Sequence, residues 1–70
     1  MAETKIFGKG IGGLGARVTT DDERVIKLLA ESERISFGRH ARRQGGSGTW
    51  WCGRPVVESV ERFLAEADDG

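Results

Sequence analysis

Residues 48–53 read GTWWCG and place two tryptophans side by side in a segment with the composition of a β-strand. Successive side chains of a strand leave on opposite faces, so only one of Trp50 and Trp51 can enter a core on one side of the sheet. The direction of these two side chains therefore decides which face is buried and which aromatic group is left for binding.

Two amphipathic helices are predicted on either side of this strand. The first covers about residues 21–32, where Thr20 and Glu23 have the spacing of a capping box and apolar residues follow at helical intervals. The second covers about residues 55–67, with Pro55 in its first turn and an apolar stripe along one side. Each helix needs a surface to cover its apolar side.

Two β-hairpins are predicted, one ahead of each helix. The turn-rich sequence QGGSG at residues 44–48 predicts a hairpin from Ile35 to Gly53, and residues 5–7 and 16–19 flank a glycine-rich segment in the same way. The sequence thus predicts one small α+β domain over residues 1–70, with the order ββαββα and both helices on one face of an antiparallel sheet. Residues 1–4 and 68–70 are expected to fray.

The two ββα halves resemble each other, which is consistent with an internal repeat. Three sequence blocks recur in the same order in residues 5–32 and 34–67, although gaps are needed and the many glycines could produce part of the match by chance. This alignment pairs Trp51 with Val18 and Trp50 with Arg17, which predicts Trp51 in the core and Trp50 on the open face. The predicted core is Val18, Val25, Leu28, Leu29, Ile35, Phe37, Trp51, Val60, Phe63 and Leu64.

Charge is balanced overall but unevenly distributed. The chain has 11 basic and 11 acidic residues, yet no acid lies between Arg34 and Val57. An exposed tryptophan among arginines can stack on a base and contact phosphate. The candidate binding residues are Arg17, Arg39, His40, Arg42, Arg43, Trp50 and Arg54. Two alternatives stay open: a second copy or the N-terminal segment covers Trp50, or the arginines only solvate a hairpin edge.

The sequence offers little for catalysis. Cys52 and His40 are single residues of their kind, so neither a disulfide nor a metal-ligand set is expected, and no spacing unites a nucleophile with a base. The glycines from Gly8 to Gly15 match G-x-G-x-x-G twice, but the helix that a dinucleotide site requires does not follow directly, which favours a turn or loop. We therefore expect no enzyme activity, cofactor or metal.

Neither a signal peptide nor a membrane span is apparent, so a cytoplasmic protein without membrane contact is expected. Two functions fit the aromatic and arginine surface. The first is a small regulator or inhibitor, such as a phage-type accessory protein, that binds a nucleic-acid-processing or defence complex and can form a homodimer. The alternative is a module that binds nucleic acid directly through Trp50 and the basic hairpin. Neutral net charge favours the first function, and the clustering of the arginines favours the second.

Overall fold

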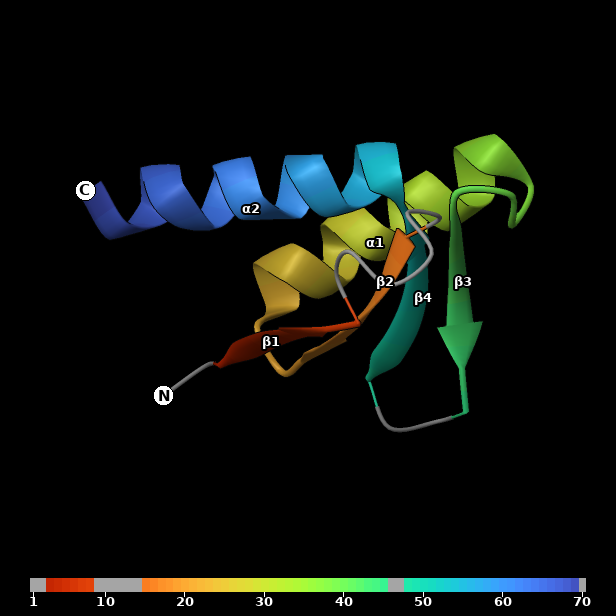
Figure 1. Ribbon diagram of the computed structural model, residues 1–70, viewed down its shortest axis with the longest axis horizontal. Coiled ribbons are helices and arrows are strands. Elements are labelled where there is room, and N and C mark those ends of the chain that lie inside the picture. The colour runs from red at the N-terminus through yellow and green to blue at the C-terminus, as the bar shows by residue number, and fades with distance from the viewer. Residues whose placement is uncertain (1–2, 9–14, 46–47, 70) are drawn as a thin grey trace.

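A four-stranded antiparallel sheet carries both helices on one face (Figure 1). The computed structural model describes residues 3–8, 15–45 and 48–69. The elements in chain order are β1 (Thr4–Phe7), β2 (Gly15–Thr20), α1 (Glu23–Ser36), β3 (Ala41–Gln44), β4 (Thr49–Gly53) and α2 (Arg54–Asp69). The predicted ββαββα order is confirmed.

The strand order is β1-β2-β4-β3, so each hairpin contributes one central and one edge strand. All three neighbouring pairs are antiparallel, and the central pair joins β2 of the first half to β4 of the second. A pseudo-twofold axis between β2 and β4 would give this order. Figure 1 shows β1 and β3 at the two outer edges, with α1 and α2 layered on the same side of the sheet.

The core lies between the sheet and the two helices. Its buried apolar residues are Ala16, Val18, Val25, Leu29, Ala41, Trp50, Cys52, Val56, Val57 and Val60. Of the predicted core residues, Val18, Val25, Leu29 and Val60 are completely buried, and Leu28, Phe63 and Leu64 pack against the core while partly exposed.

The predicted directions of the two tryptophans are wrong. Trp50 is only 2% exposed and pairs across the central strands with the fully buried Val18. Trp51 pairs with the exposed Arg17 and leaves on the opposite face, which carries no helix. The repeat alignment gave Trp51 the position, and therefore the face, of Val18, whereas in the structure Trp50 shares the face of Val18. An alignment error of one residue is enough to exchange the two faces of a strand.

The segment predicted to begin the second hairpin is instead the end of α1. The hairpin spans Ala41 to Gly53, and Ile35 and Phe37, predicted in the core, are 65% and 91% exposed. Ser32 and Ser36 lie within the helix, and their hydroxyls donate to the backbone carbonyls four residues earlier, at 2.9 and 2.6 Å. The alternation of Ile35, Ser36 and Phe37 thus arises at a helix end and not in a strand.

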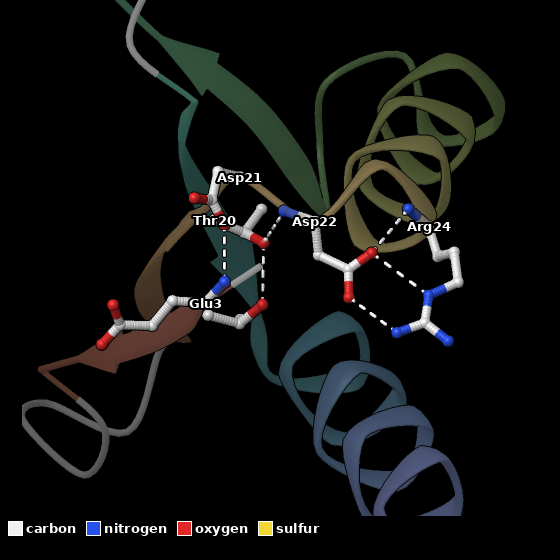
Figure 2. Close-up of polar contacts among 6 residues, drawn as sticks. Glu3, Thr20, Asp21, Asp22 and Arg24 are labelled. Carbon is white, nitrogen blue, oxygen red and sulfur yellow. Dashed lines mark hydrogen bonds and ion pairs between the residues drawn. The ribbon is translucent and has the colours of Figure 1, made fainter. Parts of the chain in front are cut away.

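A polar corner joins β1, β2 and the start of α1 (Figure 2). The Asp21 carboxylate accepts the Glu3 N–H at 2.5 Å, and the Thr20 hydroxyl accepts the Asp22 N–H at 3.0 Å. Asp22 is the N-cap of α1, and its Oδ1 accepts the Arg24 N–H at 2.9 Å. The predicted capping box is therefore wrong, because Asp22 caps the helix and Thr20 supports Asp22.

The ends of the described chain are regular. Thr4 belongs to β1, and its hydroxyl lies 2.7 Å from that of Thr20. Residues 68 and 69 form the last residues of α2. Most of the predicted glycine-rich loop, residues 9–14, lies outside the described residues.

Burial of Trp50 predicts a strong dependence of stability on this side chain. Trp50→Ala removes the largest fully buried side chain, and such a change costs about 3–5 kcal/mol of unfolding free energy. The Trp50 Nε1–H has no acceptor among the described residues, so Trp50→Phe removes an unpaired donor along with some volume. Urea unfolding should therefore rank wild type, then Trp50→Phe, then Trp50→Ala. Equal stability of the alanine variant and the wild type would contradict the core assignment.

The Asp22 cap predicts a pH dependence of stability. The Arg24 side chain and backbone N–H donate to the Asp22 carboxylate and lower its pKa from the ordinary value of 3.8. A lowered folded-state pKa contributes stability that is present above the unfolded-state pKa and is lost as the pH falls through the folded-state value. Asp22→Asn should be less stable than wild type at pH 7, and the difference should shrink below pH 3.8. Acid titration of unfolding measures this, with Glu66→Gln as the control for loss of an exposed carboxylate.

Candidate functional site

The helix-free face of the sheet presents a row of alternating aromatic and basic residues, one from each strand. Phe7 of β1 pairs with Arg17 of β2, Arg17 pairs with Trp51 of β4, and Trp51 pairs with Arg42 of β3. Side chains directly opposite each other on neighbouring strands stand about 5 Å apart at Cβ. We call these four residues, Phe7, Arg17, Trp51 and Arg42, the open-face row.

The two aromatic rings of the open-face row are accessible from solvent. Phe7 is 50% exposed, and Trp51 is partly exposed between its two arginine neighbours. Within the described residues, guanidinium groups stack on Phe63 and Trp50 and on no other ring. No cation of residues 3–8, 15–45 or 48–69 therefore lies over the Trp51 indole. Strand spacing puts Phe7 and Trp51 about 10 Å apart, with Arg17 between them.

The open face is basic, although the whole chain is neutral. Arg17 and Arg42 are exposed and form no ion pair with the described residues. Lys5 also lies on this face, where Glu3 pairs with it at 3.7 Å. None of the 11 acidic residues of the chain lies in a strand. Apart from Glu3, which precedes β1 and pairs with Lys5, the acids lie on the helices or in residues 21 and 22 just before α1, so the charged side chains of the strands are basic.

Hydroxyl groups continue the open face beside the row. Thr19 and Thr49 pair across the central strands, and their Oγ1 atoms lie 3.2 Å apart. Gln44 pairs with Thr49 on the outer side. The threonine hydroxyls and the Gln44 amide can each donate and accept hydrogen bonds, so this part of the face can bind polar groups of a ligand.

Trp50 and Arg43, both predicted to bind, lie on the helix side of the sheet. Arg43 pairs with Trp50, and its guanidinium stands over the indole, 5.2 Å from the ring centroid. The Arg43 backbone N–H donates to Glu33 Oε2 of α1 at 3.0 Å. Arg43 thus covers the edge of the core and ties the edge strand β3 to the helix.

The other predicted site residues lie in three parts of the fold. Arg17 and Arg42 stand on the open face beside Trp51. Arg39 and His40 lie in the turn after α1, and Arg54 begins α2, where it pairs with Glu58 at 3.6 Å. The structure therefore brings Arg17 and Arg42 together with Trp51. His40 lies next to this row, because the Gly53 N–H donates to the His40 carbonyl at 2.6 Å and continues the pairing of β3 with β4, which puts His40 on the same face as Arg42. Arg39 and Arg54 are not part of the row.

Sequence reasoning missed Phe7 and Trp51 as candidate site residues. The alternation T-W-W-C contained a usable signal for Trp51, because the phase that buries Trp50 also buries the apolar Cys52. The opposite phase would bury Thr49 with Trp51. Phe7 lies in a four-residue strand, which is too short for its alternation to be informative.

Cys52 is a core residue whose chemistry is suppressed. Its side chain is completely buried, and desolvation raises the pKa of the thiol from the ordinary 9.0 to about 11. The thiolate is the nucleophilic form of cysteine, so this thiol is a poor nucleophile near neutral pH.

Residues 3–8, 15–45 and 48–69 contain no group of three or more His, Cys, Asp or Glu side chains arranged to hold a metal ion. In the same part of the chain, no helix has the length and apolar character needed to cross a lipid bilayer.

Comparison with known proteins gives no match to a protein-family model, to a curated protein or to a solved structure. The fold and the open-face row define a small α+β domain with an aromatic and basic sheet surface.

Burial of Cys52 predicts slow labelling by thiol reagents. Because the thiol is buried and its pKa is about 11, iodoacetamide should modify Cys52 only when the domain opens. Urea should accelerate labelling in parallel with the unfolded fraction, and Trp50→Ala should label faster than wild type in buffer. The labelling rate at pH 7 is measured by mass spectrometry. Rapid labelling of the folded wild type would contradict the burial of Cys52.

Proposed function

We propose that this protein binds single-stranded nucleic acid on the open face of its sheet. The observation that carries the proposal is the open-face row, in which Trp51 stands between Arg17 and Arg42 with Phe7 beyond Arg17. An aromatic ring on a sheet stacks on an unpaired base, and neighbouring arginines neutralise the phosphates on either side of it. The chain acts here as a non-enzymatic binding module.

A single strand fits this surface better than a duplex. The bases of a duplex are stacked on each other, so a ring on an open sheet can reach a base only where the strand is unpaired. Phe7 and Trp51 are separated by one strand, and Arg17 stands between them, where it can contact the phosphate that links two stacked nucleotides. The threonines beside the row add hydrogen-bonding groups for sugar and base edges.

The distribution of charge supports nucleic acid more strongly than net charge alone suggested. The acidic side chains lie outside the strands, and all of them except Glu3 belong to the helix layer or the two residues before it, so a bound phosphate backbone would meet mainly basic side chains. Arg17 and Arg42 have no ion pair to break within the described residues before they contact phosphate. The neutral composition therefore does not weigh against nucleic acid.

Binding should depend on Trp51 and on salt. Loss of a stacking aromatic costs about 1–3 kcal/mol per base, so Trp51→Ala should weaken binding of a mixed-sequence single-stranded 12-mer by about 5- to 150-fold. Each of Arg17→Ala and Arg42→Ala should reduce the slope of log affinity against log salt by about 0.7, the value for one phosphate contact on a single strand. Fluorescence anisotropy with labelled DNA and RNA measures both effects.

Two matched variants control for general loss of charge or of an aromatic side chain. Lys27→Ala removes an exposed cation from α1, and Phe37→Ala removes an exposed ring outside the open face. Both should bind like the wild type. If the folded Trp51→Ala and Arg17→Ala variants bind as tightly as wild type, or if duplex binds better than single strand, the proposal is wrong.

A further inference from the structure

A second surface lies at the other layer of the domain, where α1 ends and α2 begins. A groove of about 570 Å³ is formed there by the last turn of α1, the turn at residues 37–40 and the first residues of α2. Ile35, Phe37, Pro55 and Val56 provide its apolar lining. Its polar lining consists of Arg39 and His40 together with the hydroxyl-bearing Ser32, Ser36 and Ser59. Figure 1 shows this end of α1 beside the start of α2, on the helix side of the sheet.

The apolar side chains of this groove are more exposed than folding requires. Ile35 is 65% exposed and Phe37 is 91% exposed, whereas the other large apolar residue that is clearly exposed in the described chain, Phe7, belongs to the open-face row. Adjacent exposed apolar side chains beside a hollow mark a surface that another molecule covers. Single scattered residues would carry no such meaning.

The backbone conformation of Phe37 is a second, independent indication that this surface is used for binding. Phe37 has a φ of 53°, in the left-handed region that disfavours residues with a Cβ and that glycine adopts freely at the ends of helices. Its N–H and the Gly38 N–H satisfy α1 by donating to the carbonyls of Arg34 and Glu33, at 3.4 and 2.9 Å. These bonds use only the backbone, so glycine would serve the fold better. An aromatic ring at this position gains nothing from the core and so points to a use outside it.

The polar groups define the charge of the occupant. Arg39 and His40 are exposed, they form no ion pair with the described residues, and the lining of the groove contains no acidic side chain. We propose that the groove binds a segment of a partner protein in which bulky apolar side chains are flanked by carboxylates. The apolar groups contact Ile35, Phe37 and Val56, and the carboxylates pair with Arg39 and His40.

A symmetric dimer through the groove fits less well than a different partner. Such an interface brings the same patch of two copies together, so the Arg39 and His40 groups of both would meet without an acid in the lining to neutralise them. Nucleic acid also fits less well, because it would place hydrated phosphates against Ile35, Phe37 and Pro55. This proposal is independent of the nucleic-acid proposal, because Trp51 lies on the opposite face of the sheet.

The test is an NMR titration of the full chain with two synthetic peptides of equal apolar content. One is an amphipathic leucine and phenylalanine peptide with glutamates, and the other has lysines in place of the glutamates. The glutamate peptide should shift the amide signals of Ile35, Phe37, Arg39, His40 and Val56 and leave those of Trp51 and Arg17 unchanged. The lysine peptide should bind at least about tenfold more weakly.

Phe37→Gly is the decisive variant, because it removes the ring and suits the left-handed backbone, so the domain should remain folded. It should lose about tenfold or more in affinity for the glutamate peptide, whereas the matched control Phe7→Ala should retain wild-type affinity. Arg39→Glu should reverse the preference between the two peptides.

Three outcomes would overturn this proposal. The first is equal binding of both peptides, which would make the groove apolar without charge selectivity. The second is the absence of shifts at the groove with either peptide. The third is sedimentation of the wild type as a dimer that Phe37→Gly converts to monomer, which would make a second copy the occupant.

Discussion

Packing of Trp50 between the sheet and the helices is the constraint on which the rest of the structure depends. Trp50 is the largest fully buried side chain, and Val18 and Cys52 share its face of the central strands. Because side chains alternate along a strand, this burial commits Trp51 to the opposite face. The register of β2 and β4 then places Arg17 next to Trp51, and that of β3 places Arg42 on its other side. One packing choice in the core thus assembles the surface proposed to bind nucleic acid.

Long periodic patterns allowed most of the architecture to be predicted, whereas the directions of individual side chains depended on short patterns. Both helices and the ββαββα order follow from apolar stripes several turns long and from the clustering of turn residues. The tryptophan pair is ambiguous from alternation alone, because either phase buries one indole. The residue that shares a face with each tryptophan could have decided which one is buried. Cys52 shares the face of Trp50 and is apolar, whereas Thr49 shares the face of Trp51 and is polar. The repeat alignment favoured the wrong phase because an error of one residue is enough to invert a strand.

At the end of α1, the local sequence does not distinguish a helix from a strand. Ile35, Ser36 and Phe37 alternate like a strand, but Ser36 bonds back to Ser32 within the helix, and Gly38 follows where a helix would end. Both interpretations satisfy the local pattern, and the choice depends on the hydrogen bonds of the last turn and on the contact of α1 with β3. Because the helix continues, Ile35 and Phe37 lie outside the core. Ile35 and Phe37, which the sequence predicted in the core, line the groove beside α2 because the helix continues through Ser36.

Segregation of charge between the layers relates the two proposed surfaces to each other. The strands are free of acid, and the acidic residues of the helices would repel a phosphate backbone from the helix layer. Under the proposed function, this repulsion would direct a nucleic acid toward the open-face row and away from the groove, although the groove itself has Arg39 and His40. Apolar Ile35 and Phe37 then separate the two kinds of ligand further, since they favour a protein segment over a hydrated strand. The two proposed surfaces are centred on opposite faces of the sheet, with Trp51 on the open face and Phe37 on the helix side, and they approach each other where the Arg42 guanidinium lies beside Gly38 in the turn that borders the groove.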